Sequence, residues 1–144
     1  MTISDNYCGT ATATATAGGL GNAGGSVTMK NTILANNVSD YSPDCANGFI
    51  SDGFNLVLDD SGCTITGILD TIIGQDPMLA PLVDVGGISW AHPLYRNSPG
   101  IDDGPSSCIY VDQRQLGRPK DGNMDGIHTC DIGAYEAYIC IFHH

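Results

Sequence analysis

Glutamate and basic residues are scarce in this sequence. Glu136 is the only glutamate among 16 acidic residues, and lysine and arginine together number five. Helical surfaces normally use Glu and Lys, which have good helix propensity, so this composition predicts little helix. Nucleic acids and anionic membranes are bound by clustered Lys and Arg. The formal net charge of −11 therefore disfavours both as partners and favours cations, with an acidic surface that serves only solubility as the alternative.

Several targeting and catalytic signatures are also missing. No apolar segment is long enough to span a membrane. The opening stretch MTISDNYCGTATATA lacks the basic start and apolar run of a signal peptide, so we expect an export signal upstream of a chain that is a fragment. The G-x-S-x-G pattern of many serine hydrolases does not occur. Cys-x-x-Cys is also absent, which disfavours zinc and thioredoxin-type sites.

Turn-forming residues are abundant instead. The sequence contains 19 glycines, and Asn, Asp or Gly interrupts nearly every apolar run. The β-favouring runs are about three to four residues long, shorter than typical strands. They lie at 26–29, 32–34, 49–50, 56–58, 63–66 and 71–73. We therefore expect an all-β chain that turns often.

Strands this short are better suited to stacking as successive turns of a solenoid than to pairing in isolated hairpins. Their spacing also leaves no room for crossover helices. We predict a short right-handed parallel β-helix of few rungs, with a β-sandwich as the alternative. Residues 1–25, rich in Ala, Thr and Gly, are expected to be a low-complexity leader or partial rung, and 26–74 to be rungs. Residues 75–144, proline-rich and without a period, are expected to form an irregular C-terminal cap within the same domain.

Six widely spaced cysteines predict disulfides and an oxidising compartment, with six buried thiols as the alternative. We expect Cys45 to pair with Cys63, and Cys108 with Cys130, because each pair brackets one turn-rich excursion. Two further cysteines, Cys8 and Cys140, either pair with each other or remain unpaired.

A series of short motifs runs through residues 26–136. It comprises 30–37 (KNTILANN), 44–45 (DC), 53–56 (GFNL), 62–63 (GC), 76–77 (DP), 81–82 (PL), 86–87 (GG), 92–94 (HPL), 98–102 (SPGID), 112–114 (DQR), 118–119 (RP) and 130–136 (CDIGAYE). In this order, the motifs resemble the choice-of-anchor Q domain, the C-terminal part of bacterial parallel β-helix (pectate-lyase-like) surface proteins. The resemblance implies a secreted or cell-surface location and fixes no reaction.

The stretch 121–126, DGNMDG, matches the start of many calcium loops. An EF-hand would need Glu at the twelfth loop position, where this chain has Ile132, so an EF-hand is excluded. Hard oxygen ligands at alternate positions nevertheless suit Ca²⁺. The predicted ligands are Asp121, Asn123, Asp125 and Asp131, with Glu136 as a further candidate. The alternative is an Asx-rich turn that needs no metal.

A second polar concentration surrounds the D-Q-R motif. One interpretation is structural: an Arg–carboxylate pair, with Asp102 or Asp131 as the acid, holds the cap to the rungs. The other is catalytic, with Asp102, Asp112 and Arg114 in a cleft, as β-helix polysaccharide lyases and hydrolases use Asp and Arg. Similarly, His92 and Trp90 would serve as a general base and a sugar platform, or simply as packing residues.

Three functions remain open at this level. The first is a noncatalytic, calcium-stabilised extracellular domain for surface display or adhesion, with a polysaccharide or cell-surface component as partner. The second is a carbohydrate-active, or less readily an ester-active, hydrolase or lyase that uses acids and arginine of the cap. The third is a self-associating structural protein, since open solenoid ends can stack.

Overall fold

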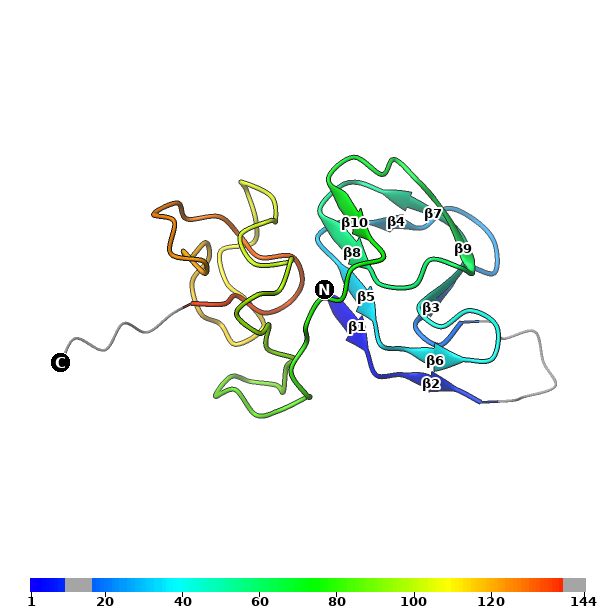
Figure 1. The fold of residues 1–144 in the computed structure, drawn as a ribbon, viewed down its shortest axis with the longest axis horizontal. Coiled ribbons are helices and arrows are strands. Elements are labelled where there is room, and N and C mark those ends of the chain that lie inside the picture. Colours follow the sequence, from blue (N-terminus) through cyan, green and yellow to red (C-terminus); the bar gives the residue numbers. More distant parts are fainter. Residues whose placement is uncertain (10–16, 139–144) are drawn as a thin grey trace. The chain divides into compact units, whose positions relative to one another are not determined.

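The computed structural model describes residues 1–9 and 17–138 (Figure 1). This part of the chain is all-β, as predicted: it contains ten strands and no helix. The chain divides into two compact units, Met1–Pro77 and Met78–His144. Within the described residues, there is no helix long and apolar enough to cross a membrane.

The strands of the first unit pair in parallel. One sheet has the order β1-β5-β8-β10. Its members are β1 (Thr2–Ser4), β5 (Ile33–Ala35), β8 (Asn55–Val57) and β10 (Thr71–Ile73). The register aligns one apolar residue from each strand in a single row, namely Ile3, Leu34, Val57 and Ile73. Such a row lets branched side chains pack against one another across the sheet.

The other strands form two further groups. In the smaller, β2 (Tyr7–Cys8) pairs with β6 (Val38–Ser39). In the larger, β7 (Cys45–Ser51) pairs with β3 (Leu20–Gly21), β4 (Thr28–Met29) and β9 (Cys63–Thr66). β7 is longer than the expected runs because β3 and β4 pair with its two ends while β9 follows its middle. Successive strands of the chain thus keep returning to the same groups.

The core of this unit lies between the sheets. Its buried cluster comprises Met29, Leu34, Cys45, Phe49 and Val57. Both β5 and β8 are buried along their whole length, whereas the outer strands β1 and β10 are half-buried. The inner strands are therefore covered by neighbours on both edges, and the apolar core runs continuously through them.

Asparagine and aspartate shape the bends, as expected from the sequence. Three asparagines adopt left-handed φ values, Asn31 (49°), Asn36 (60°) and Asn47 (71°). The amide of Asn37 donates to the carbonyl oxygens of Ile3 and Ala35, at 3.0 and 3.2 Å. Buried Asp44 accepts from both the backbone and the side-chain nitrogens of Asn37, at 3.0 and 2.9 Å. These side chains satisfy backbone groups where the strands end.

A disulfide joins Cys45 to Cys63, which confirms the predicted pair. It links β7 to β9, with the two Cα atoms 5.5 Å apart. Gly62 precedes the bridge at a close approach, since a Cβ there would lie 2.1 Å from the Ser42 hydroxyl. This position therefore requires glycine.

The second unit is irregular over its described residues, 78–138. Isolated antiparallel bridges take the place of sheets, at Leu79–Leu94, Val83–Ala91, Val111–Gly117 and Lys120–Thr129. The predicted Cys108–Cys130 disulfide is confirmed, with Cα atoms 6.5 Å apart. Cys130 of this disulfide is almost completely buried, and so is Ile132, two residues further along the chain. Of the two remaining cysteines, Cys140 lies outside the described residues.

Candidate functional site

The Asp112 and Arg114 side chains form a closed, buried ion pair. Nε and Nη2 of Arg114 lie 2.7 and 2.6 Å from Oδ2 of Asp112. Oδ1 accepts from the backbone amides of Arg114 and Leu116, at 2.8 and 3.1 Å, and Oδ2 accepts from that of Glu136 at 3.2 Å. Burial raises the pKa of Asp112, but the hydrogen bonds, led by that of Arg114, hold it below its usual value.

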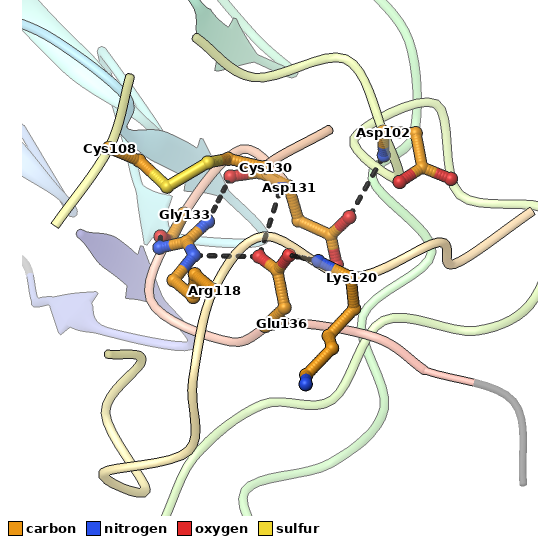
Figure 2. The surroundings of a disulfide bond; sticks show 8 residues. All are labelled: Asp102, Cys108, Arg118, Lys120, Cys130, Asp131, Gly133 and Glu136. Carbon is orange, nitrogen blue, oxygen red and sulfur yellow. Dashed lines mark hydrogen bonds and ion pairs between the residues drawn. A yellow bond between two sulfur atoms is a disulfide. The ribbon is translucent and has the colours of Figure 1, made fainter. Parts of the chain in front are cut away.

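Arg118 and Glu136 form a second buried pair, shown in Figure 2. Nε of Arg118 lies 2.6 Å from Oε2 of Glu136, and both side chains are almost completely buried. Arg118 also donates to the carbonyl oxygens of Gly133 and Asp131. Glu136 accepts from the backbone amides of Lys120 and Asp131, at 2.7 and 3.0 Å. This pair therefore ties the backbone segment 118–120 to the segment 131–136.

Asp131 carries a buried carboxylate with two backbone donors. Its oxygens accept from the amides of Asp102 and Ala137, at 2.9 and 2.5 Å. No cation pairs with this carboxylate among the described residues. Burial, together with the negative charges of Glu136 and Asp102, raises the pKa of Asp131 to about 7.

The expectation that an arginine would pair with Asp102 or Asp131 is wrong. The guanidinium groups instead hold the carboxylates of Asp112 and Glu136. The cause is geometric: both oxygens of Asp131 face backbone amides, so the carboxylate is already satisfied. Arg118 reaches Asp131 only at its backbone carbonyl.

The predicted calcium ligands fall into two places. Asp121 accepts from the amides of Met124, Asp125 and Gly126, at 2.6, 3.2 and 2.9 Å. Asn123 and Asp125 each accept from the amide two residues further on. The carboxylate of Asp102 caps the same loop by accepting from the amides of residues 122 and 123. These contacts build an exposed, tightly turned loop at 120–129, closed by the bridge between its ends.

Asp131 and Glu136, which were expected to complete the calcium shell, are used elsewhere. Their carboxylate oxygens hold backbone amides, and Glu136 also holds Arg118. The described residues contain no group of three or more His, Cys, Asp or Glu side chains that could hold a metal. Calcium binding would therefore depend on Asp121, Asn123 and Asp125 with backbone and solvent oxygens, and it remains a prediction.

The predicted catalytic residues are committed to structural contacts. Asp102 holds loop amides, whereas Asp112 holds Arg114 and a different set of amides. His92 contacts the Ala80 carbonyl oxygen through Nδ1 at 2.9 Å. Trp90 is 60% exposed. The two aspartates thus hold different backbone segments, and a catalytic role for them stays a prediction.

A cleft of about 650 Å³ opens beside the 120–129 loop, and sequence reasoning did not find it. Its walls include Arg114, Leu116, Lys120, Asp121, Met124, His128 and Tyr138. The bridge between Lys120 and Thr129 brings two of the three basic wall residues, Lys120 and His128, to the same end of the loop. One signal was available in the sequence, since these basic residues bracket the D-x-N-x-D-G motif in an otherwise acidic chain.

Comparison with family models, curated proteins and solved structures finds no match to this chain.

Proposed function

We propose that this chain is a noncatalytic extracellular module for surface display or adhesion, built as a short parallel β-helix that ends in an irregular cap. Two disulfides support an oxidising environment. The net negative charge is compatible with an extracellular location, because it favours solubility and disfavours binding to nucleic acid.

The pattern of strand pairing supports the β-helix. Each group of strands is parallel, and the chain begins in the first sheet at β1 and returns to it three times, at β5, β8 and β10. Parallel pairing of successive short strands without an intervening helix is the arrangement expected when each turn of a coil stacks on the previous one. The choice-of-anchor Q resemblance belongs to the same proposal, because its motifs span both units.

The buried Asp112–Arg114 pair carries the noncatalytic assignment. A general acid or base must reach a substrate atom, yet both oxygens of Asp112 are held by protein donors and its side chain is fully buried. Its lowered pKa keeps the group ionised and paired with Arg114. These contacts support a role in holding the backbone.

The alternative is a carbohydrate-active hydrolase or lyase. It draws support from the two acids on the cleft walls, Asp121 and Glu136, and from exposed Trp90, which would offer a flat platform for a sugar ring. This reading requires Asp112 or Asp102 to leave its present partners when substrate binds.

Stability and turnover measurements on two variants separate these readings. Arg114→Ala leaves Asp112 buried without its cation, so we expect a loss of about 3–5 kcal/mol in unfolding free energy. Asp112→Asn should also destabilise, because it removes the charge that Arg114 needs. Wild-type protein should show no turnover in a screen of acidic and neutral polysaccharides.

The opposite result would support the enzyme. Turnover by the wild type, abolished in Asp112→Asn with an unchanged melting temperature, would overturn the noncatalytic proposal. Arg114→Lys serves as the matched control, because it keeps the charge but loses the planar fork, and it should fall between wild type and Arg114→Ala in stability.

A further inference from the structure

The cleft beside the 120–129 loop contains a buried arginine with an unused donor. Arg114 is 7% exposed and lines the cleft. Its Nε and Nη2 hold Asp112 and the Glu136 carbonyl oxygen, but Nη1 contacts no acceptor among the described residues. Ser4 Oγ is the one fully buried side-chain nitrogen or oxygen without a partner in this part of the chain, so Nη1 is not sealed from solvent.

The position of this guanidinium is fixed by its surroundings. The Asp112 pair holds one side, and the Tyr135 ring lies 3.7 Å from the guanidinium carbon. The Tyr138 ring lies on the same group at 5.7 Å. The cation–π contacts, together with two guanidinium nitrogens on one oxygen of Asp112, restrict the side chain, so Nη1 is held in place before any ligand arrives.

Two further basic groups lie on the walls of the same cleft. Lys120 and His128 are exposed, and no acceptor among the described residues contacts either side chain. Figure 2 shows the Lys120 side chain extending away from the Glu136 carboxylate that its backbone amide holds. Three other Lys and Arg side chains remain in the sequence. Arg118 is buried against Glu136, Lys30 pairs with Asp52 in the other unit, and Arg96 is exposed but does not line the cleft.

The rest of the cleft is largely apolar. Leu116, Met124 and Tyr138 are 41%, 47% and 47% exposed, so their side chains remain available to a ligand. The one acidic wall residue that faces solvent, Asp121, has both oxygens on loop amides, which offsets part of its charge. A cavity of about 650 Å³ is within the usual range for small-molecule sites.

The geometry points to a binding site for an organic carboxylate, with the anion at Arg114 Nη1, Lys120 and His128 and an apolar or ring-shaped body against Leu116, Met124 and Tyr138. A carboxylate accepts up to four hydrogen bonds and matches the guanidinium plane. The apolar walls exclude a bare inorganic anion as the best ligand, because burying them contributes affinity only when the ligand carries a body. A sugar acid and an aromatic acid share this chemistry.

This inference rests on the proposed adhesion function only for its biological role. Carboxylate binding by the cleft can be measured whether or not the protein is displayed on a surface. Calorimetric titration of the full chain with glucuronate and with benzoate tests it, and glucose and inorganic phosphate are the neutral and bare-anion controls. We expect one of the two carboxylates to bind with a dissociation constant of about 1 mM or tighter, and both controls at least about tenfold more weakly. Whichever carboxylate binds more tightly identifies the kind of body that the cleft accepts.

Two lysine variants make the matched comparison. Lys120→Met should weaken carboxylate binding by about tenfold or more, because it removes a charge-assisted hydrogen bond. Lys30→Met makes the same change in net charge outside the cleft and should alter binding by less than about twofold. Because the Lys120 side chain is exposed, its replacement should leave the melting temperature unchanged. His128→Gln provides a second variant at the same cleft wall.

The inference would be overturned by either of two results. One is the absence of binding by both carboxylates up to about 50 mM, or phosphate or glucose binding as tightly as they do. The other is equal binding by wild type, Lys120→Met and His128→Gln. Neither result touches the turnover and stability tests of Arg114, so failure of this site and failure of the proposed function can be told apart.

Discussion

The two units satisfy their backbone hydrogen bonds by different means. In Met1–Pro77, parallel strands pair with one another, and side chains such as Asn37 and Asp44 act mainly at the bends. In the second unit, carboxylates accept the backbone amides that no strand partner reaches, as Asp112 and Glu136 do. The second unit therefore relies on buried carboxylates for backbone hydrogen bonds that strand pairing supplies through most of the first unit.

The same contrast separates their ion pairs. The Lys30–Asp52 pair of the first unit is exposed, with side chains 53% and 62% accessible. In the second unit the Arg118–Glu136 pair is 4% and 1% accessible. Exposed pairs contribute little to stability, whereas breaking a buried pair leaves an uncompensated charge. Charge should therefore matter far more to the second unit.

The largest expected effect comes from breaking the buried pair. Arg118→Met leaves Glu136 buried without its cation, so the second unit should lose about 3–5 kcal/mol of unfolding free energy. Trp90 is the only tryptophan and lies in this unit, so its fluorescence can follow denaturant unfolding there.

The matched variant for this prediction lies in the first unit. Lys30→Met removes the same charge from an exposed pair and should cost less than about 1 kcal/mol. Equal losses in the two variants would contradict the contrast drawn between the units.

Much of the first unit could be predicted from its sequence, because β-favouring runs and turn residues that are close together in the chain determine many of its strands and bends. The runs at 63–66 and 71–73 coincide with β9 and β10, and the expected 45–63 disulfide follows from a turn-rich excursion between the two cysteines. The strands in residues 1–25 were less visible. There, β1, β2 and β3 depend on partners in β5, β6 and β7 that are far along the chain.

The second unit was harder because its organising contacts have no period. Arg118 and Glu136 are separated by 18 residues, and nothing in their local sequence marks them as partners. The Asp112–Arg114 pair is local, yet its burial depends on Glu136 and Tyr135 from another segment. The cleft also escaped prediction, because Arg114 and Tyr138 reach it from separate segments.

The next effect in size is a pH dependence centred on Asp131. Its pKa is raised from 3.8 to about 7 in the folded state, mainly by burial. The folded chain therefore keeps a proton that the unfolded chain has released, so stability is full below about pH 4 and falls as pH rises toward 7. Between pH 5 and pH 8 the loss should be about 3 kcal/mol.

Unfolding of the wild type and of Asp131→Asn across this range measures the effect. The variant cannot ionise at this position, so its stability should lack this decline, and groups common to both proteins cancel in the comparison. The lowered pKa values of Asp112 and Asp59 act in the opposite sense, since their contributions are lost only as pH falls below about 3.8. Parallel pH profiles for the two proteins would show that Asp131 is not responsible.

The smallest expected effect is that of calcium on the 120–129 loop. Asp121, Asn123 and Asp125 already organise this loop by accepting its amides, so a bound ion would add charge compensation to a turn that forms without it. At a free concentration about fivefold above the dissociation constant, mass action gives about 1 kcal/mol of added stability. Trp90 fluorescence should register this gain in the second unit, and magnesium should substitute poorly because it needs a tighter octahedral shell. Asp121→Asn combined with Asp125→Asn should remove the response without lowering the stability of the strands in Met1–Pro77. If calorimetry detects no heat of binding and chelation leaves the melting temperature unchanged, the motif is a turn held by its own side chains.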